Sequence, residues 1–199
     1  MTVVKVCGIT SVEDARAAVA AGAGALGFNF YPKSPRYVSP AEAALIAATV
    51  PAGILKVGVF VNETAARVAG IVQEAGLDVA QLHGDERPED VPAGIPVWKA
   101  FRVTDSFRLE QLAEFSAEAF LLDTPTELYG GSGHTFDWTR ARGAAGRILL
   151  AGGLDESNVR EAIAAAQPWG VDACSRLESA PGKKDHGRME RFIAAAHSV

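Results

Sequence analysis

Residues 55–84, LKVGVFVNETAARVAGIVQEAGLDVAQLHG, hold the pattern that decides the fold. An apolar β-rich run (55–61) is followed by an Ala-rich amphipathic stretch and then by a second β-rich run (79–84). Strand, helix and strand in that order predict two parallel strands joined by a helix. The same alternation recurs along the chain, which favours a parallel sheet with both faces buried.

Eight β-rich runs share this spacing. They are VVKVCG (3–8), ALGFNF (25–30), LKVGVFV (55–61), VAQLHG (79–84), PVWKAFRV (96–103), AFLLDT (119–124), RILLAG (147–152) and GVDACS (170–175). Eight parallel strands favour closure into a single small (βα)8 TIM barrel over residues 1–199. The alternative is an open doubly wound sheet, which we disfavour because no GxGxxG follows the first strand.

Cap-like residues open the segments between the strands, as expected of helices. We expect helix starts at Ser11 with Asp14, Ser39 with Glu42, Asn62, Ser106, Asp137 and Asp155. After the fourth strand, DERPEDVPAGIP (85–96) holds three prolines and leaves room only for a short turn of helix. No linker or low-complexity tract divides the chain, which predicts one domain.

Composition and charge exclude several classes of function. Hydrophobic residues make up 48% and charged residues 22% of the 199, which is ordinary for a compact globular domain. The net charge of −5 gives no drive toward nucleic acid or an anionic membrane. No stretch approaches the roughly 18 apolar residues of a membrane span, and no signal peptide pattern opens the chain, so we expect a cytoplasmic protein. We expect it to be a monomer or a homodimer.

The cysteines predict neither a disulfide nor a metal site. Cys7 and Cys174 are the two cysteines of the chain, and they lie far apart in sequence without a CxxC motif or paired histidines nearby. We therefore expect two free thiols.

The carboxyl ends of the strands of a (βα)8 barrel carry the active site, because the βα loops converge there on one mouth. The residues at these ends are Cys7, Asn29 with the KSPRY loop (33–37), His83, Arg102, Asp123, Gly152, Gly153, Ser175 and Arg176. We expect these side chains and glycines to face one pocket.

Asp123 and Cys7 are the candidates for proton transfer. Asp123 ends the apolar run AFLLDT, where partial burial favours the protonated carboxyl and suits a general acid, although the same residue could simply cap the next turn. Cys7 stands at a strand end before Gly8, close to a helix N-terminus that favours a thiolate. The competing interpretation of Cys7 is a small buried hydrophobe.

Two loops favour a phosphorylated small-molecule ligand. The AGG after strand seven and CSRLESAPGKKD (174–185) after strand eight stand where barrel enzymes bind phosphate through backbone N–H groups, although Gly152 and Gly153 would also suit a plain tight turn. Arg36 in KSPRY suits a bidentate contact with an anion. His83, Arg102 and His134 receive no catalytic role, since packing or solvent explains each of them.

Nine segments, taken in order, resemble the phosphoribosylanthranilate isomerase family over the whole chain. They are KVCGIT (5–10), LGFNFYPKSPRYV (26–38), VGVFVNE (57–63), QLHGDE (81–86), LLDT (121–124), YGGSGHTFDW (129–138), LAGGLDESNV (150–159), VDACS (171–175) and PGKKD (181–185). The resemblance implies a cofactor-free and metal-free Amadori rearrangement of N-(5-phosphoribosyl)anthranilate in tryptophan biosynthesis. It also implies Cys7 and Asp123 as catalytic residues and Arg36 as the contact for the anthranilate carboxylate.

One departure from the family lies after strand eight. The family commonly carries Ser-Ser-Gly where this chain reads Cys174-Ser175-Arg176. Arg176 either contacts the phosphate by its charge or points outward while its backbone N–H still donates. This leaves the phosphate contacts of that loop open.

Three alternative functions are weighed against the resemblance. A barrel isomerase of histidine synthesis performs the same rearrangement, but it carries an aspartate in place of Cys7. A catalytically silent barrel would only bind phosphorylated metabolites or partners, which the presence of Cys7 and Asp123 disfavours. A thiol-redox role for Cys7 and Cys174 is disfavoured because the chain has no CxxC.

Overall fold

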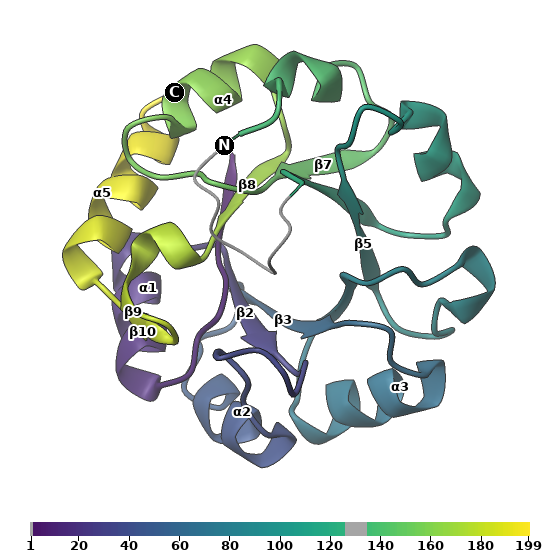
Figure 1. Cartoon of the computed structure of the whole chain (residues 1–199). Helices are drawn as coiled ribbons and strands as arrows, with labels where there is room; N and C mark the ends of the chain where they lie inside the picture. The colour runs from purple at the N-terminus through teal and green to yellow at the C-terminus, as the bar shows by residue number, and fades with distance from the viewer. Residues whose placement is uncertain (1, 126–134) are drawn as a thin grey trace.

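A closed barrel of eight parallel strands forms the centre of the molecule (Figure 1). The computed structural model describes residues 2–125 and 135–199. The strands are β1 (Val3–Val6), β2 (Ala25–Asn29), β3 (Leu55–Phe60), β4 (Val79–Leu82), β5 (Val97–Arg102), β6 (Ala119–Asp123), β7 (Arg147–Leu150) and β8 (Gly170–Ala173). Each strand pairs with the next, and β8 returns to pair with β1. The (βα)8 barrel is confirmed, and the open sheet is wrong.

Helices form a ring around the barrel (Figure 1). The α-helices are α1 (Val12–Ala21), α2 (Pro40–Ala47), α3 (Ala65–Glu74), α4 (Val159–Ala166) and α5 (His186–His197), and the 3-10 helices are η1 (Pro88–Asp90), η2 (Leu109–Glu114), η3 (Trp138–Ala141) and η4 (Ser175–Leu177). A short antiparallel pair, β9 (Glu178–Ala180) and β10 (Lys183–Lys184), precedes α5. The proline-rich segment after β4 holds only the short η1, as predicted.

Several predicted caps are confirmed. The Ser11 hydroxyl oxygen accepts a hydrogen bond from the backbone N–H of Asp14 at 3.1 Å. Ser39 and Glu42 form a complete capping box at the start of α2. Asp137 accepts from a backbone N–H at the start of η3. These side chains satisfy N–H groups that have no partner within the helix.

Three predicted helix starts are wrong by two or three residues. The structure begins the helices after Thr64, Arg108 and Asn158 instead of Asn62, Ser106 and Asp155. The earlier residues hydrogen-bond to loop atoms instead, Ser106 and Asp155 within their own loops and Asn62 to the loop after β4. Among them, Asn62 has a φ of 53°, and its Oδ1 accepts from the backbone N–H of Asp85 at 2.7 Å.

Two apolar cores flank the sheet, one between the barrel and its helices and one inside the barrel. The inner core consists of Ala25, Val57, Val79, Trp98, Ala100, Ala119, Leu121, Leu149 and Ala151. Alternate residues of a strand face the same side of a sheet. The inner face of β4 therefore continues from Val79 to Gln81 and His83, and that of β6 from Leu121 to Asp123.

Among the described residues, none of the helices has the length and apolar character needed to cross a membrane.

Candidate active site

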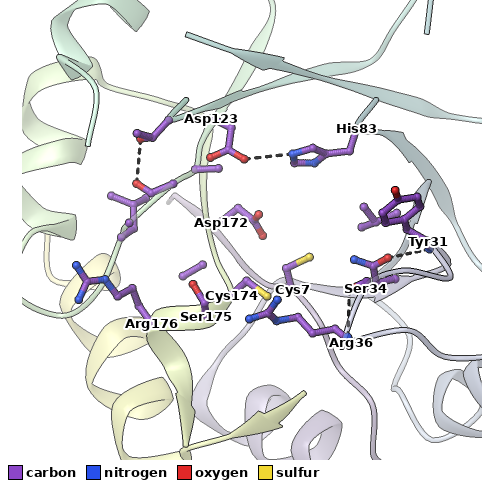
Figure 2. A pocket seen from close by; sticks show the side chains of 18 of the residues that line it. Cys7, Tyr31, Ser34, Arg36, His83, Asp123, Asp172, Cys174, Ser175 and Arg176 are labelled. Carbon is purple, nitrogen blue, oxygen red and sulfur yellow. Dashed lines mark hydrogen bonds and ion pairs between the residues drawn. The ribbon is translucent and has the colours of Figure 1, made fainter. Parts of the chain in front are cut away.

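One pocket of about 350 Å³ opens at the carboxyl ends of the barrel strands (Figure 2). Its size suits a small organic ligand. The pocket is lined by all the predicted site residues, which are Cys7, Arg36, Asp123, Gly152, Gly153, Ser175 and Arg176, and by Asn29, His83 and Arg102. The expectation of one shared pocket is confirmed for these residues. His134 lies outside the described residues.

Cys7 and Cys174 lie side by side at the ends of the first and last strands. The pairing of β1 with β8 matches Val6 with Ala173, and the backbone N–H of Cys7 donates to the carbonyl of Ala173 at 2.9 Å. The next residues along the two strands are the two cysteines, and both line the pocket (Figure 2). Both thiols are free, as predicted, but they are neighbours.

A hydrogen bond from the Cys174 thiol makes Cys7 the more acidic thiol of the pair. Donation from Cys174 lowers the pKa of Cys7 well below its ordinary value, and burial opposes the shift. The ammonium groups of Lys5 and Lys184 lower the pKa of Cys7 further. The same hydrogen bond, together with burial, raises the pKa of Cys174. The lowered pKa of Cys7 favours its thiolate, which is the basic and nucleophilic form, and the raised pKa of Cys174 favours its thiol.

A buried ion pair lies under this thiolate. Lys5 is fully buried, and its Nζ donates to Oδ1 of Asp172 at 2.8 Å. Burial alone would lower the pKa of Lys5, but the charges of Asp172 and Cys7 outweigh burial and raise it. Burial raises the pKa of Asp172 to about 6, although Lys5 opposes the shift. The Lys5 ammonium thus stays charged next to Cys7.

Arg36 is fixed on the pocket wall by a carboxylate behind it. Its Nε and Nη2 atoms donate to the two carboxylate oxygens of Glu178 at 2.8 and 2.7 Å. The buried Nζ of Lys184 donates to the same carboxylate at 3.0 Å. Burial opposes ionisation of Glu178, but the hydrogen bond from Arg36 and the charge of Lys184 outweigh it and lower the pKa of Glu178. Glu178 uses two of the five guanidinium N–H donors and orients the others.

Asp123 is held by a chain of polar side chains along the inner face of β4. Nε2 of His83 lies 3.1 Å from Oδ2 of Asp123 (Figure 2), and Nδ1 of His83 lies 2.8 Å from the amide nitrogen of Gln81. A contact at each ring nitrogen fixes the orientation of the imidazole between Gln81 and Asp123. Gln81 is fully buried, and its Oε1 has no hydrogen-bond partner in the described part of the chain.

A second buried ion pair braces the loop that carries His83. Lys99 donates to Glu86 at 2.7 Å and to the carbonyl of Gly84 at 2.8 Å. The backbone N–H of Gly84 donates back to the carboxylate of Glu86 at 3.0 Å. Gly84, which directly follows His83, therefore has both its backbone N–H and its carbonyl oxygen hydrogen-bonded.

The loops after β7 and β8 form the side of the pocket that carries Ser175 and Arg176, and Tyr31 and Ser34 lie on the other side (Figure 2). Gly152 and Gly153 have φ values of 86° and 71°. Nε of Arg176 lies 4.0 Å from Oδ2 of Asp155. Within residues 2–125 and 135–199, no group of three His, Cys, Asp or Glu side chains could hold a metal ion.

Sequence reasoning missed Asp172, which lines the pocket, and the charged groups behind the pocket: Lys5, Glu178 and Lys184. A signal for the first pair was present. Lys5 interrupts the apolar run of the first strand, and Asp172 interrupts that of the eighth. The two strands become neighbours only when the barrel closes, so the pairing follows once closure is assumed.

Residues 4–195 match the family model of N-(5'-phosphoribosyl)anthranilate (PRA) isomerase. The chain belongs to this family. The resemblance found in the sequence is thereby confirmed, and with it the prediction of an isomerase.

Relatives of the PRA isomerase family match along their whole length. The N-(5'-phosphoribosyl)anthranilate isomerase of Solibacter usitatus is 60% identical over 198 residues, covering 99% of this chain and 98% of the relative. The crystal structure of the Thermotoga maritima enzyme has a TM-score of 0.92 at 42% identity, with both chains covered completely. A crystal structure of the isomerase in complex with reduced 1-(o-carboxyphenylamino)-1-deoxyribulose 5-phosphate has a TM-score of 0.88 at 39% identity and full coverage of both chains.

Proposed function

We propose that the chain converts N-(5'-phosphoribosyl)anthranilate to 1-(2-carboxyphenylamino)-1-deoxy-D-ribulose 5-phosphate, a step of tryptophan biosynthesis, with Cys7 as general base and Asp123 as general acid. The observation that carries the proposal is that a cysteine with a lowered pKa and an aspartate face one pocket from β1 and β6. A related isomerase with a reduced form of this product bound supports the choice of ligand.

The rearrangement needs one proton delivered and one removed. The Asp123 carboxyl protonates the ring oxygen of the ribose as the bond from C1 to that oxygen breaks, which leaves a cationic imine at C1. The Cys7 thiolate then takes the proton from C2, and the electron pair forms the double bond of an enolamine. Tautomerisation gives the ketone. Each positioned proton transfer contributes typically about 10²- to 10⁴-fold, and because the atoms of the substrate are only rearranged, no cofactor is consumed.

His83 is a positioning residue in this scheme. Its Nε2 lies 3.1 Å from Oδ2 of Asp123, and its other ring nitrogen lies 2.8 Å from the side-chain amide of Gln81. One carboxyl oxygen of Asp123 is thereby engaged, and the other can face the ribose. Precise placement of a reacting group is worth several orders of magnitude in rate.

The two charged ends of the substrate would hold the ribose between acid and base. Arg36, fixed by Glu178, offers its remaining N–H donors to the anthranilate carboxylate. Gly152, Gly153, Ser175 and Arg176 lie where the phosphate would sit, with the Arg176 guanidinium adding positive charge.

The direct test is turnover of freshly prepared phosphoribosylanthranilate, followed by its loss of fluorescence, beside the formimino substrate of the histidine-pathway isomerase. We expect turnover of the first substrate only. Turnover of the second alone would assign the histidine-pathway reaction, and binding without turnover of either would favour a silent barrel.

A further inference from the structure

The neighbouring sulfur atoms of Cys7 and Cys174 have a geometry that a disulfide can use. Neighbouring strands of a sheet lie about 4.8 Å apart, and disulfides join Cα atoms roughly 4.4 to 6.8 Å apart. The pairing of Val6 with Ala173 places the two cysteines opposite each other. A Cβ atom added to Gly8 would lie 2.9 Å from Sγ of Cys174, so this sulfur packs against the backbone next to Cys7.

The surroundings of the two sulfur atoms favour the reactive form. Nζ of Lys184 lies 3.8 Å from Sγ of Cys174. A Cβ atom on Gly27 would lie 2.8 Å from Sγ of Cys7 and 3.1 Å from Nζ of Lys5, so the second ammonium is close to Cys7 as well. Two buried positive charges next to two thiols stabilise one thiolate, and a thiolate open to solvent through a pocket reacts with peroxides.

We propose that Cys7 and Cys174 form a redox pair in which hydrogen peroxide oxidises Cys7 and Cys174 resolves the product as a reversible disulfide. The Cys7 thiolate attacks one peroxide oxygen, the O–O bond breaks, and Cys7 becomes a sulfenic acid while hydroxide leaves. The Cys174 sulfur then attacks the Cys7 sulfur and displaces the hydroxyl. The displaced hydroxyl takes the proton of the Cys174 thiol and leaves as water. The hydroxide of the first step takes the proton that Cys7 gave up to solvent when it ionised, so two thiols and one peroxide give one disulfide and two waters. An external dithiol reverses the step.

Cys174 is the one other cysteine of the chain, so it is the only thiol that can resolve an oxidised Cys7 within the molecule. A chain with serine at this position has no resolving thiol, so its oxidised Cys7 would continue to the sulfinic acid, which dithiols do not reduce. Cys174 would thus protect Cys7 from irreversible oxidation. Loss of turnover on oxidation rests on the proposed role of Cys7 as base, whereas formation of the disulfide does not.

The first test treats the whole wild-type protein with hydrogen peroxide, unfolds it and counts thiols beside the intact mass. We expect both thiols to disappear, the mass to fall by two hydrogen atoms, and a peptide map to link Cys7 to Cys174. Turnover should fall about 100-fold or more, since a general base contributes roughly 10²- to 10⁴-fold, and dithiothreitol should restore it. Two remaining thiols, a disulfide between two chains, or sulfinic acid at Cys7 would each overturn the proposal.

The matched variant is Cys174→Ser, measured against its own untreated activity. We expect peroxide to add oxygen atoms to Cys7 of this variant and dithiothreitol to leave the loss of turnover in place. Recovery of the variant to the same extent as wild type would contradict a resolving role for Cys174. If the variant does not fold, the thiol count and peptide map of the wild type decide the question. A disulfide in a protein that fails to turn over phosphoribosylanthranilate would keep this inference and refute the proposed function.

Discussion

A Cβ atom on Gly152 would lie 2.5 Å from Oδ1 of Asp123, because the loop after β7 passes directly against the end of β6. The same atom would lie 2.5 Å from the backbone nitrogen of Thr124. Contacts this short are repulsive, so the loop can pass there only without a side chain. The sequence suggested this glycine for phosphate binding, and the structure shows that it also leaves room for the carboxyl of Asp123.

We expect Gly152→Ala to displace Asp123 and to lower kcat by about 100-fold, since a misplacement of about 1 Å can cost that much. The measurement is steady-state turnover of phosphoribosylanthranilate together with thermal unfolding. The matched control is Gly143→Ala, because Gly143 has a φ of 78° but nothing within 4 Å of an added Cβ. The control should lose stability and keep kcat. An equal fall of kcat in both variants would mean that backbone strain, not the contact with Asp123, is responsible.

Lys5→Met should destabilise the fold by about 3 to 5 kcal/mol at alkaline pH, because it leaves the buried carboxylate of Asp172 without its partner. Loss of Lys5 also raises the pKa of Asp172, so the carboxyl becomes protonated and the destabilisation shrinks as the pH falls through that raised pKa. Urea unfolding at several pH values measures both effects. The double variant Lys5→Met with Asp172→Asn should lose less than the sum of the single variants, and strict additivity would argue against the pair.

In the wild type, Asp172 should itself contribute to the pH dependence of the free energy of unfolding. Its folded pKa of about 6 lies above the ordinary 3.8, so the folded state binds the proton more tightly between these values. The contribution of Asp172 to the free energy of unfolding is therefore complete below about pH 4 and is lost as the pH rises through 6. If this assignment holds, the difference in unfolding free energy between the wild type and Asp172→Asn changes with pH across this range, because the other titrating groups are common to both proteins.

The acid side of the pH profile of kcat/KM should follow Cys7. A general base must be deprotonated, so kcat/KM falls as the pH drops through the pKa of that base. The hydrogen bond from Cys174 lowers the pKa of Cys7, so activity should persist well below the ordinary range of a thiol. Cys174→Ala removes the donor and should move the acid limb to higher pH. An unmoved limb would show that the hydrogen bond does not set the pKa of the base.

Arg36→Lys should raise the KM for phosphoribosylanthranilate about ten- to a hundred-fold and change kcat little. A lysine keeps the charge but loses the planar donors, and hydrogen bonds to charged groups are worth about 1.5 to 3 kcal/mol. Glu178 would keep the ammonium of Lys184, so the fold should survive. A fall in kcat at unchanged KM would place Arg36 in the chemistry and not in substrate binding.

Much of this site could be predicted from the sequence, because in a barrel a residue's position at the end of a strand is enough to place it at the site. Each strand end projects toward one mouth, so Cys7, His83, Arg102 and Asp123 could be brought together without knowledge of any contact. The parts that escaped sequence analysis depend on contacts between distant strands. The link from Gln81 through His83 to Asp123 needs β4 and β6, which are separated by β5, to end at the same barrel mouth. The adjacency of the two cysteines appears only when β8 pairs with β1.

The helix starts show the limit of local patterns. Asn62 is a good N-cap type, yet its side chain bonds to the backbone of Asp85 on the next loop. A tertiary contact thus outweighed the local preference, and α3 begins after Thr64. The same physics explains why Ser11 and Ser39 were predicted well, since their partners lie three residues away in the same helix.

Turnover of phosphoribosylanthranilate by the wild type, Cys7→Ala and Asp123→Asn, measured side by side under single-turnover conditions, tests the account most directly. We expect the wild type to convert the substrate, and each variant to bind it while losing about 100-fold or more in rate, as expected for the loss of one positioned proton transfer. Wild-type rates in either variant would contradict the assignment of that residue as acid or base.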